Sequence, residues 1–241
     1  MALSLSPSRV TKSHGPAFRL GWFVGRLIVW FLALSVGLTL LYRFVPVPVT
    51  VTMLADPNGF TRDWTPLSEI DRDMVDAAIA GEDGNFCSHK GFDRAAMETA
   101  MRKNVAGKRL RGGSTISQQT AKNVFLWQGT GWSRWLRKGL EAWFTVLIEN
   151  VWGKRRIMEV YLNVAETGIG TYGAEAGAQR YYRKPAASLS PTEAARIAAA
   201  LPAPKRRAVT GATGFTRRHG NVIAARIGVV SRDGLDACVY K

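Results

Sequence analysis

The chain has 241 residues, 46% of them hydrophobic, and is long enough for one sizeable domain plus an anchor. Its 33 Lys and Arg residues against 18 Asp and Glu give a formal net charge of +15 at pH 7, which predicts an anionic partner such as a nucleic acid, an acidic membrane or a phosphorylated substrate. No recognisable nucleic-acid motif accompanies the charge, and no Cys/His cluster has metal-ligand spacing, so a nucleic-acid-binding domain and a protein-ligated zinc site are both disfavoured.

The first 55 residues contain no Asp or Glu and include an apolar run. Residues 27–42 carry no charge, and extension back to Phe23 gives about 30 Å of helix, which matches a hydrocarbon core but includes Arg26. The ten Leu, Ile, Val and Phe residues of 27–42 favour insertion by roughly 0.3–0.6 kcal/mol each, whereas one arginine costs about 2.5–3.5 kcal/mol at the centre and less near an end. The favourable contribution of the apolar residues exceeds the cost of the arginine, so we expect a membrane anchor at residues 23–42.

The charges around this run predict its orientation. Four basic residues precede the uncharged stretch, against Arg43 directly after it, so the positive-inside rule places the N-terminus in the cytoplasm. The expected parts are a basic cytoplasmic tail, the anchor, a linker and an exported domain, at residues 1–22, 23–42, 43–60 and 61–241. A cleaved signal peptide is the alternative, although no convincing small-x-small site follows the run.

An exported domain would place both cysteines of the chain in an oxidising space. A disulfide between Cys87 and Cys238 is then permitted, but nothing in the sequence shows that the two can meet. Two isolated thiols are the simpler expectation.

Beyond the anchor, the patterns in chain order favour helices. Pro46 and Pro48 alternate with valines, which indicates an extended linker or a short edge strand. Thr65-Pro66 indicates a helix N-cap followed by proline at the first helical position, and the apolar stripe after it ends at Glu82.

The later patterns are helical as well. Thr115 with Gln118, and the segment 190–193, each match a capping box at a helix start. Residues 132–152 repeat apolar side chains at three- and four-residue spacing, which predicts a long amphipathic helix. Further helices are expected around 157–161 and 194–201, so the domain is predicted to be mostly α.

Four polar blocks carry the chemistry of this chain. They span residues 82–93, 113–123, 137–141 and 154–163 and read EDGNFCSHKGFD, GSTISQQTAKN, RKGLE and KRRIMEVYLN. Transfer of a sugar from a diphosphate needs a carboxylate base for the acceptor hydroxyl and cations for the departing charge, and the blocks supply both. In order and spacing they resemble the peptidoglycan glycosyltransferases of glycosyltransferase family 51, specifically the monofunctional biosynthetic transglycosylases.

The resemblance covers roughly residues 60–205 and implies a lysozyme-like helical glycosyltransferase domain with a small membrane-proximal lobe, which is also the glycan-polymerase domain of class A penicillin-binding proteins. It implies polymerisation of lipid II into β-1,4 glycan strands, with inversion and release of undecaprenyl diphosphate. The implied place is the bacterial inner membrane, with the catalytic domain in the periplasm. The implied partners are lipid II, the nascent strand, the membrane and other wall-synthesis or division proteins. No cofactor is expected, with Mg²⁺ or Mn²⁺ at the diphosphate left open.

The matched motif positions imply roles for individual residues. Glu82 is implied as the base that activates the acceptor's 4-hydroxyl, and Glu141 as the carboxylate that assists near the diphosphate. The implied cations for the diphosphate are Lys122, Arg137 and Lys138. The other implied substrate-contacting or cleft-shaping residues are Asp83, Phe86, His89, Ser114, Thr115, Gln118, Gln119, Asn123, Lys154 and Arg155.

Plainer interpretations of the same residues stay open. Arg137 and Glu141 could be a surface i,i+4 ion pair, and Thr115 with Gln118 could be only a cap. Five aromatic residues suit either a membrane interface or a buried core, namely Phe125, Trp127, Trp132, Trp135 and Trp143. The rival functions are a lytic muramidase of similar fold, which predicts no cation cluster, and a non-enzymatic wall-binding scaffold. No Ser-x-x-Lys motif occurs, so no transpeptidase domain is expected.

Overall fold

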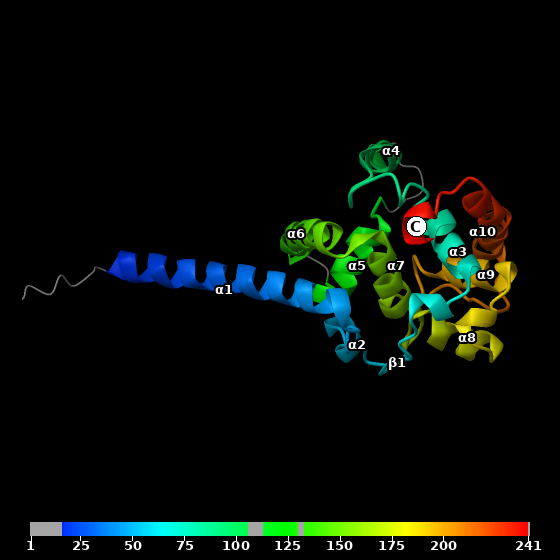
Figure 1. Cartoon of the computed structure of the whole chain (residues 1–241), viewed down its shortest axis with the longest axis horizontal. Helices are drawn as coiled ribbons and strands as arrows, with labels where there is room; N and C mark the ends of the chain where they lie inside the picture. The colour runs from blue at the N-terminus through cyan, green and yellow to red at the C-terminus, as the bar shows by residue number, and fades with distance from the viewer. Residues whose placement is uncertain (1–15, 106–112, 130–132, 241) are drawn as a thin grey trace, which may run out of the picture. The chain divides into compact units, whose positions relative to one another are not determined.

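The structure is a computed structural model that describes residues 16–105, 113–129 and 133–240 (Figure 1). It is mostly helical, as predicted, and the chain divides after Leu38 into two units. The long helix α1 spans Pro16–Phe44, and its residues from Thr39 onward belong to the second unit.

Helix α1 contains a candidate membrane span at Arg19–Phe44. At about 1.5 Å per residue, a helix of 26 residues is long enough to cross a hydrocarbon core. Large apolar side chains are exposed along it, including Leu27, Trp30 and Leu34. Such a surface favours a lipid environment over water, and the expected anchor at 23–42 lies inside this span.

The second unit is built from short helices and one small sheet. Its α-helices are α2 (Val51–Leu54), α3 (Arg72–Glu82), α4 (Arg94–Val105), α5 (Ile116–Phe125), α6 (Ser133–Val151), α7 (Gly153–Val164), α8 (Ala174–Tyr182), α9 (Pro191–Ala200), α10 (Gly214–Arg232) and α11 (Ala237–Tyr240). Its strands are β1 (Thr61–Arg62), β2 (Glu166–Gly168) and β3 (Thr171–Tyr172), in the order β1-β3-β2. Strand β3 runs parallel to β1 and antiparallel to β2.

Two groups of helices form the core (Figure 1). In the first group, α3 packs against α9 and α10. In the second group, α5 packs against α6 and α7. The alanine-rich face of α9 lets α3 approach closely: a Cβ added at Gly81 would lie 2.9 Å from Ile223 Cδ1 of α10 and 3.9 Å from Ala198 Cβ of α9. A side chain at Gly81 would therefore require the Ile223 side chain to shift.

Several predicted elements are confirmed. The capping box of Thr115 and Gln118 opens α5, and that of Ser190 and Glu193 opens α9. The amphipathic pattern at 132–152 corresponds to α6, and the apolar stripe that ends at Glu82 corresponds to α3.

The predicted helix start at Thr65-Pro66 is wrong. Only a 3₁₀ turn follows it, at Leu67–Glu69, and α3 begins at Arg72 after its N-cap Asp71. The physical reason is a distant partner. The Thr65 N–H donates to Asn163 Oδ1 at 2.8 Å, and Asn163 Nδ2 donates back to the Thr65 carbonyl at 2.9 Å, which holds Thr65 outside the helix.

The expected extended linker or edge strand after the anchor is also wrong in part. The segment after Phe44 forms no strand, and α2 occupies Val51–Leu54. Val47 and Met53 are fully buried in the core, and Arg62 donates to the Val47 and Pro48 carbonyls at 2.6 Å each. This segment therefore packs as part of the second unit.

Cys87 and Cys238 form a disulfide across 151 residues of sequence, contrary to the expectation of two isolated thiols. The bond joins the first polar block to α11. Two further contacts hold the same end of the chain: Arg72 Nη2 lies 2.6 Å from Asp236 Oδ2, and Arg155 Nη1 donates to the Val239 carbonyl at 3.1 Å.

Candidate active site

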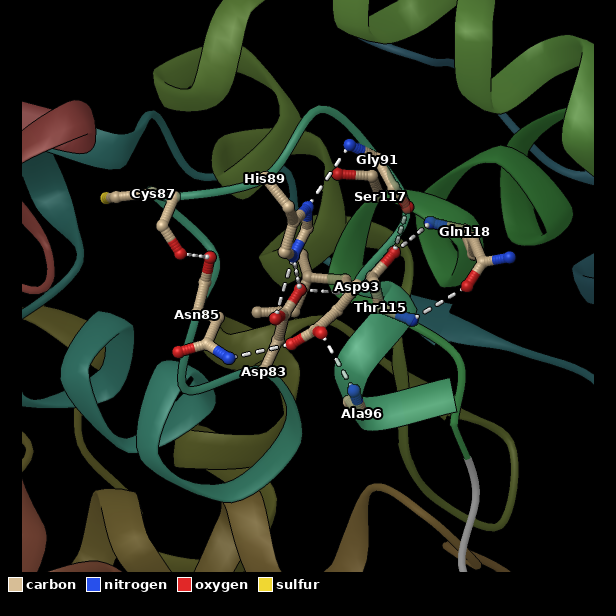
Figure 2. Close-up of polar contacts among 12 residues, drawn as sticks. Asp83, Asn85, Cys87, His89, Gly91, Asp93, Ala96, Thr115, Ser117 and Gln118 are labelled. Carbon is tan, nitrogen blue, oxygen red and sulfur yellow. Dashed lines mark hydrogen bonds and ion pairs between the residues drawn. The ribbon is translucent and has the colours of Figure 1, made fainter. Parts of the chain in front are cut away.

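Asp83 ties the first polar block to the second (Figure 2). Its carboxylate lies 2.9 and 3.0 Å from His89 Nε2, and its Oδ2 accepts from the Ile116 N–H at 3.0 Å. The Gly91 N–H donates to His89 Nδ1 at 3.1 Å, so Nε2 carries the ring hydrogen that Asp83 accepts. A carboxylate at the first residue of α5 also suits the positive end of that helix.

The capping residues of α5 complete this connection. Thr115 Oγ1 donates to the Gly91 carbonyl at 2.7 Å and accepts from the Gln118 N–H at 3.1 Å, while Gln118 Oε1 accepts from the Thr115 N–H (Figure 2). Phe86 is fully buried beneath the block. The polar atoms of these predicted site residues form hydrogen bonds with other groups of the protein. The residues therefore support the backbone around the Glu82 carboxylate.

Asp93 anchors the end of the first block. It accepts from the Ala96 N–H and from Asn85 Nδ2, both at 2.8 Å (Figure 2). The Ala96 N–H, followed by Asn85, lowers the pKa of Asp93. The loop between α3 and α4 is therefore pinned at both ends, and Glu82 leads into it from a fixed helix.

Glu82 is the last residue of α3, and its two carboxylate oxygens have different surroundings. Its Oε2 accepts from Gln119 Nε2 at 2.8 Å, whereas its buried Oε1 has no hydrogen-bond partner among the described residues. Burial raises the pKa of Glu82 and Asp83 adds to the increase, while the Gln119 hydrogen bond and the charges of Arg207 and Lys122 oppose it. A buried carboxylate with one unused oxygen is suited to accept a proton.

A cluster of cations lies within electrostatic range of this carboxylate. Burial is the main cause that lowers the pKa of Lys122; Glu141 and Glu82 oppose the decrease, and Arg137 and Lys138 add to it. The structure therefore brings together the two predicted catalytic carboxylates and the three predicted cations. Glu82 ends α3, Lys122 lies on α5, and the other three residues lie on α6.

The side chains of the third block hold one another in place. Glu141 is buried at 4% exposure and pairs with Lys138, whose Nζ also lies 3.3 Å from Ser114 Oγ. Arg137 Nη1 donates to the Trp127 carbonyl at 3.2 Å, and its buried Nε has no partner in the described part of the chain. This geometry differs from a surface ion pair, because Glu141 is out of water and Lys138 bridges two blocks.

A cavity of about 630 Å³ opens beside α5. Gln119, Lys122 and Asn123 line it on one side, with Trp127 and Tyr161 next to them. Its other wall contains residues that the sequence patterns did not single out as a site, namely Asp56, Glu166, Tyr172, Lys205 and Arg206.

That second wall is organised around Asp56. Its Oδ2 accepts from Tyr172 OH at 2.8 Å and from Lys205 Nζ at 2.9 Å. Burial opposes ionisation of Asp56, but Lys205 and its other hydrogen-bond donors outweigh burial and lower its pKa. The run Lys205-Arg206-Arg207 after Pro204 was a visible signal for this wall, although nothing in the sequence assigned it to a site.

Two predicted site residues lie outside the cluster. Lys154 Nζ pairs with Glu149 Oε1 at 2.7 Å and sits 4.5 Å from the centre of the Phe86 ring. Arg155 holds the Val239 carbonyl at the C-terminal end. Both brace the fold around the first block.

The aromatic residues near the second and third blocks separate into two environments. Phe125 stacks on Phe144 with ring centres 4.3 Å apart, and Trp143 packs against the core. Trp135 is 81% exposed, and Trp132 lies outside the described residues. Of the tyrosines, Tyr161 and Tyr172 are buried in the core. In the described ranges, no group of three or more His, Cys, Asp or Glu side chains could hold a metal ion.

Comparison with known proteins adds an independent observation. A family model described as Transglycosylase matches residues 50–227. The biosynthetic peptidoglycan transglycosylase of Caulobacter vibrioides is 47% identical over 231 residues, which cover 91% of this chain and 100% of that protein. Proteins with the same description from Rhodospirillum centenum and Pasteurella multocida are 49% and 42% identical, over 86% and 87% of this chain and 90% and 88% of their own lengths.

Proposed function

Since this chain belongs to the transglycosylase family and is a glycosyltransferase that acts on peptidoglycan, we propose that it polymerises lipid II into β-1,4 glycan strands and releases undecaprenyl diphosphate. The acceptor is a sugar 4-hydroxyl, and the donor is the sugar linked to the diphosphate. The net positive charge of the chain suits a substrate that carries two phosphates.

Glu82 is the general base in this proposal, and its unpartnered Oε1 is the observation that carries it. This oxygen takes the proton of the acceptor hydroxyl as the hydroxyl oxygen bonds to the donor C1. The bond from C1 to the diphosphate breaks at the same time, so the electron pair leaves with the diphosphate and the proton stays on Glu82. Gln119 keeps the carboxylate oriented through the other oxygen.

Lys122, Arg137 and Lys138 stabilise the departing diphosphate. A diphosphate is a good leaving group and needs no general acid, but the negative charge that develops on it must be balanced. Glu141 holds Lys138 in the cluster. We propose no resident cofactor.

The proposed location is the bacterial inner membrane, with a single span, a cytoplasmic N-terminus and the catalytic domain in the periplasm. The candidate span of α1 supports the anchor, and the disulfide supports an oxidising compartment for the domain. Other wall-synthesis and division proteins are proposed as partners because the family resemblance implies them.

The experiment is incubation of the purified full-length chain with labelled lipid II. Glycan polymer should accumulate, and Glu82→Gln should abolish it. If the chain instead released fragments from preformed strands and left lipid II unchanged, it would be a muramidase of related fold. If it bound strands without changing either substrate, it would be a scaffold.

A further inference from the structure

Arg207 has no part in the mechanism above, yet its side chain is held by two helices. It follows α9 in a turn in which the Arg207 N–H donates to the Ala203 carbonyl at 3.0 Å. Its Nη1 donates to the Ala199 carbonyl at 2.9 Å, near the C-terminal end of α9, and its Cζ lies 5.2 Å from the centre of the Phe215 ring on α10. A guanidinium at a helix C-terminus is favoured by the free carbonyls and by the helix dipole.

This anchoring point lies next to the proposed base. The C-terminal ends of α3 and α9 meet where Gly81 faces Ala198. Glu82 follows Gly81 in one helix, and Ala199 follows Ala198 in the other. The Arg207 guanidinium, bound to the Ala199 carbonyl, is therefore held at the end of α9 that meets the end of α3 carrying Glu82. Among charged groups, it opposes the rise in the pKa of Glu82 more strongly than Lys122 does.

The chemistry of the base explains why a cation is needed there. A buried carboxylate with one unpartnered oxygen tends to become protonated, and a protonated Glu82 could not accept the acceptor's hydrogen. Four ionisable groups act on it: Arg207, Lys122 from α5, its neighbour Asp83, and Tyr161 from α7. Asp83 disfavours the charged form, Tyr161 stays neutral because burial raises its pKa, and Lys122 opposes the rise in the pKa of Glu82 less strongly than Arg207 does.

We infer that Arg207 is a positioning residue for the transfer reaction, which holds Glu82 in its charged form between turnovers from a fixed point at the end of α9. The inference rests on the proposed role of Glu82. An arginine suits this task better than a lysine, because the guanidinium stays protonated when it is partly buried and cannot compete for the acceptor's proton.

The test is the pH dependence of kcat/KM for lipid II polymerisation by the full-length chain. Arg207→Gln should move the acid limb of the profile upward by about one pH unit, the scale for loss of a nearby opposite charge. Arg207→Lys, which keeps the positive charge, should bring the acid limb most of the way back to its wild-type position. The matched control is Arg232→Gln, which removes an equal charge from an exposed site where the arginine pairs with the neighbouring Asp233. It should leave the profile unchanged.

The position of the limb decides the outcome, because a variant that folds only in part loses height without moving its midpoint. Arg207→Met, which keeps the aliphatic stem over Phe215, serves as the second variant if Arg207→Gln is unstable. A wild-type acid limb in either variant overturns the inference. If Glu82→Gln is inactive while Arg207→Gln has an unshifted profile, only Arg207 has been misassigned; if Glu82→Gln retains turnover, the proposed base itself has failed.

Discussion

The side-chain amide of Gln119 donates to one carboxylate oxygen of Glu82 at 2.8 Å, so helix α5 orients the residue that ends helix α3. The same helix carries Lys122, one turn further along the chain. A single rigid element thus sets the distance between the proposed base and the proposed site of the leaving group. Precise placement of this kind contributes to rate by holding reacting groups in one geometry.

Replacement of Glu82 tests the base directly. Glu82→Gln keeps the shape and a polar contact to Gln119 but cannot take a proton, so we expect polymerisation to fall by at least ~10²-fold with folding and lipid II binding retained. Steady-state rates and a thermal melt are the measurements. Glu98→Gln, at an exposed position of α4, is the control and should behave as wild type. Near-normal turnover of Glu82→Gln would sink the assignment.

Replacement of Lys122 tests the leaving-group site. If this lysine holds charge that grows as the bond to C1 breaks, Lys122→Ala should lower kcat and kcat/KM together, on the order of 10²-fold. Lys90→Ala, which removes an exposed lysine of the first block, should change neither parameter. An increase in KM alone for Lys122→Ala would mean that the lysine contributes only to uniform binding.

The proposed topology, with the N-terminus in the cytoplasm, rests on the charge bias around α1. A reporter that is active only outside the cytoplasm, fused after Lys241, should be active in cells. The same reporter fused within residues 1–15 should be silent. Activity of a cytoplasm-dependent reporter at the C-terminus would contradict the single outward span.

The disulfide should contribute a measurable part of the stability. Cross-linking across 151 residues restricts the unfolded chain strongly, and loss of such a bond typically costs about 2–5 kcal/mol. The double variant Cys87→Ala/Cys238→Ala should therefore lose that much in a urea titration. Wild type in reductant should match it. A difference below about 0.5 kcal/mol would show that the remaining contacts of Asp236 and Val239 suffice.

A buried carboxylate pair predicts pH-dependent stability. Burial, with Asp236 adding to the effect, raises the pKa of Asp76 to about 7. Between about pH 4 and 7 the unfolded chain releases this proton while the folded chain keeps it, so the stabilisation from the protonated Asp76 falls as pH rises through that window. Asp76→Asn removes the effect, so the free energy of unfolding of wild type relative to Asp76→Asn should decrease from pH 4 to 7 and then level off. An equal difference at both pH values would contradict the prediction.

The sequence predicted the local parts of the site better than its long-range parts. The cap at Thr115, the helix that ends at Glu82 and the spacing of the blocks depend on neighbours within a few residues, and the structure has them. The start of α3 was misplaced because Asn163, far away in the sequence, captures the backbone of Thr65.

The contacts of Arg207 and Asp56 could not be derived for the same reason. Asp56 meets Lys205 across 149 residues, and Arg207, which reaches back only eight residues to Ala199, lies at the end of α3 only because α3 packs against α9. Neither residue belongs to a periodic pattern or to one of the four blocks. Periodicity identifies the face of a helix, but it does not identify which helix end will lie opposite.

The Cys87–Cys238 bond has a consequence for the order of events during biogenesis. One cysteine follows Glu82 by five residues, and 151 positions separate it from the other, so the bond can form only after the whole segment between them has been synthesised. Until then, the loop that carries the first polar block lacks this covalent restraint. The bond then adds its restraint late, and a chain truncated before Cys238 would leave the Cys87 thiol free to pair with a thiol of another molecule.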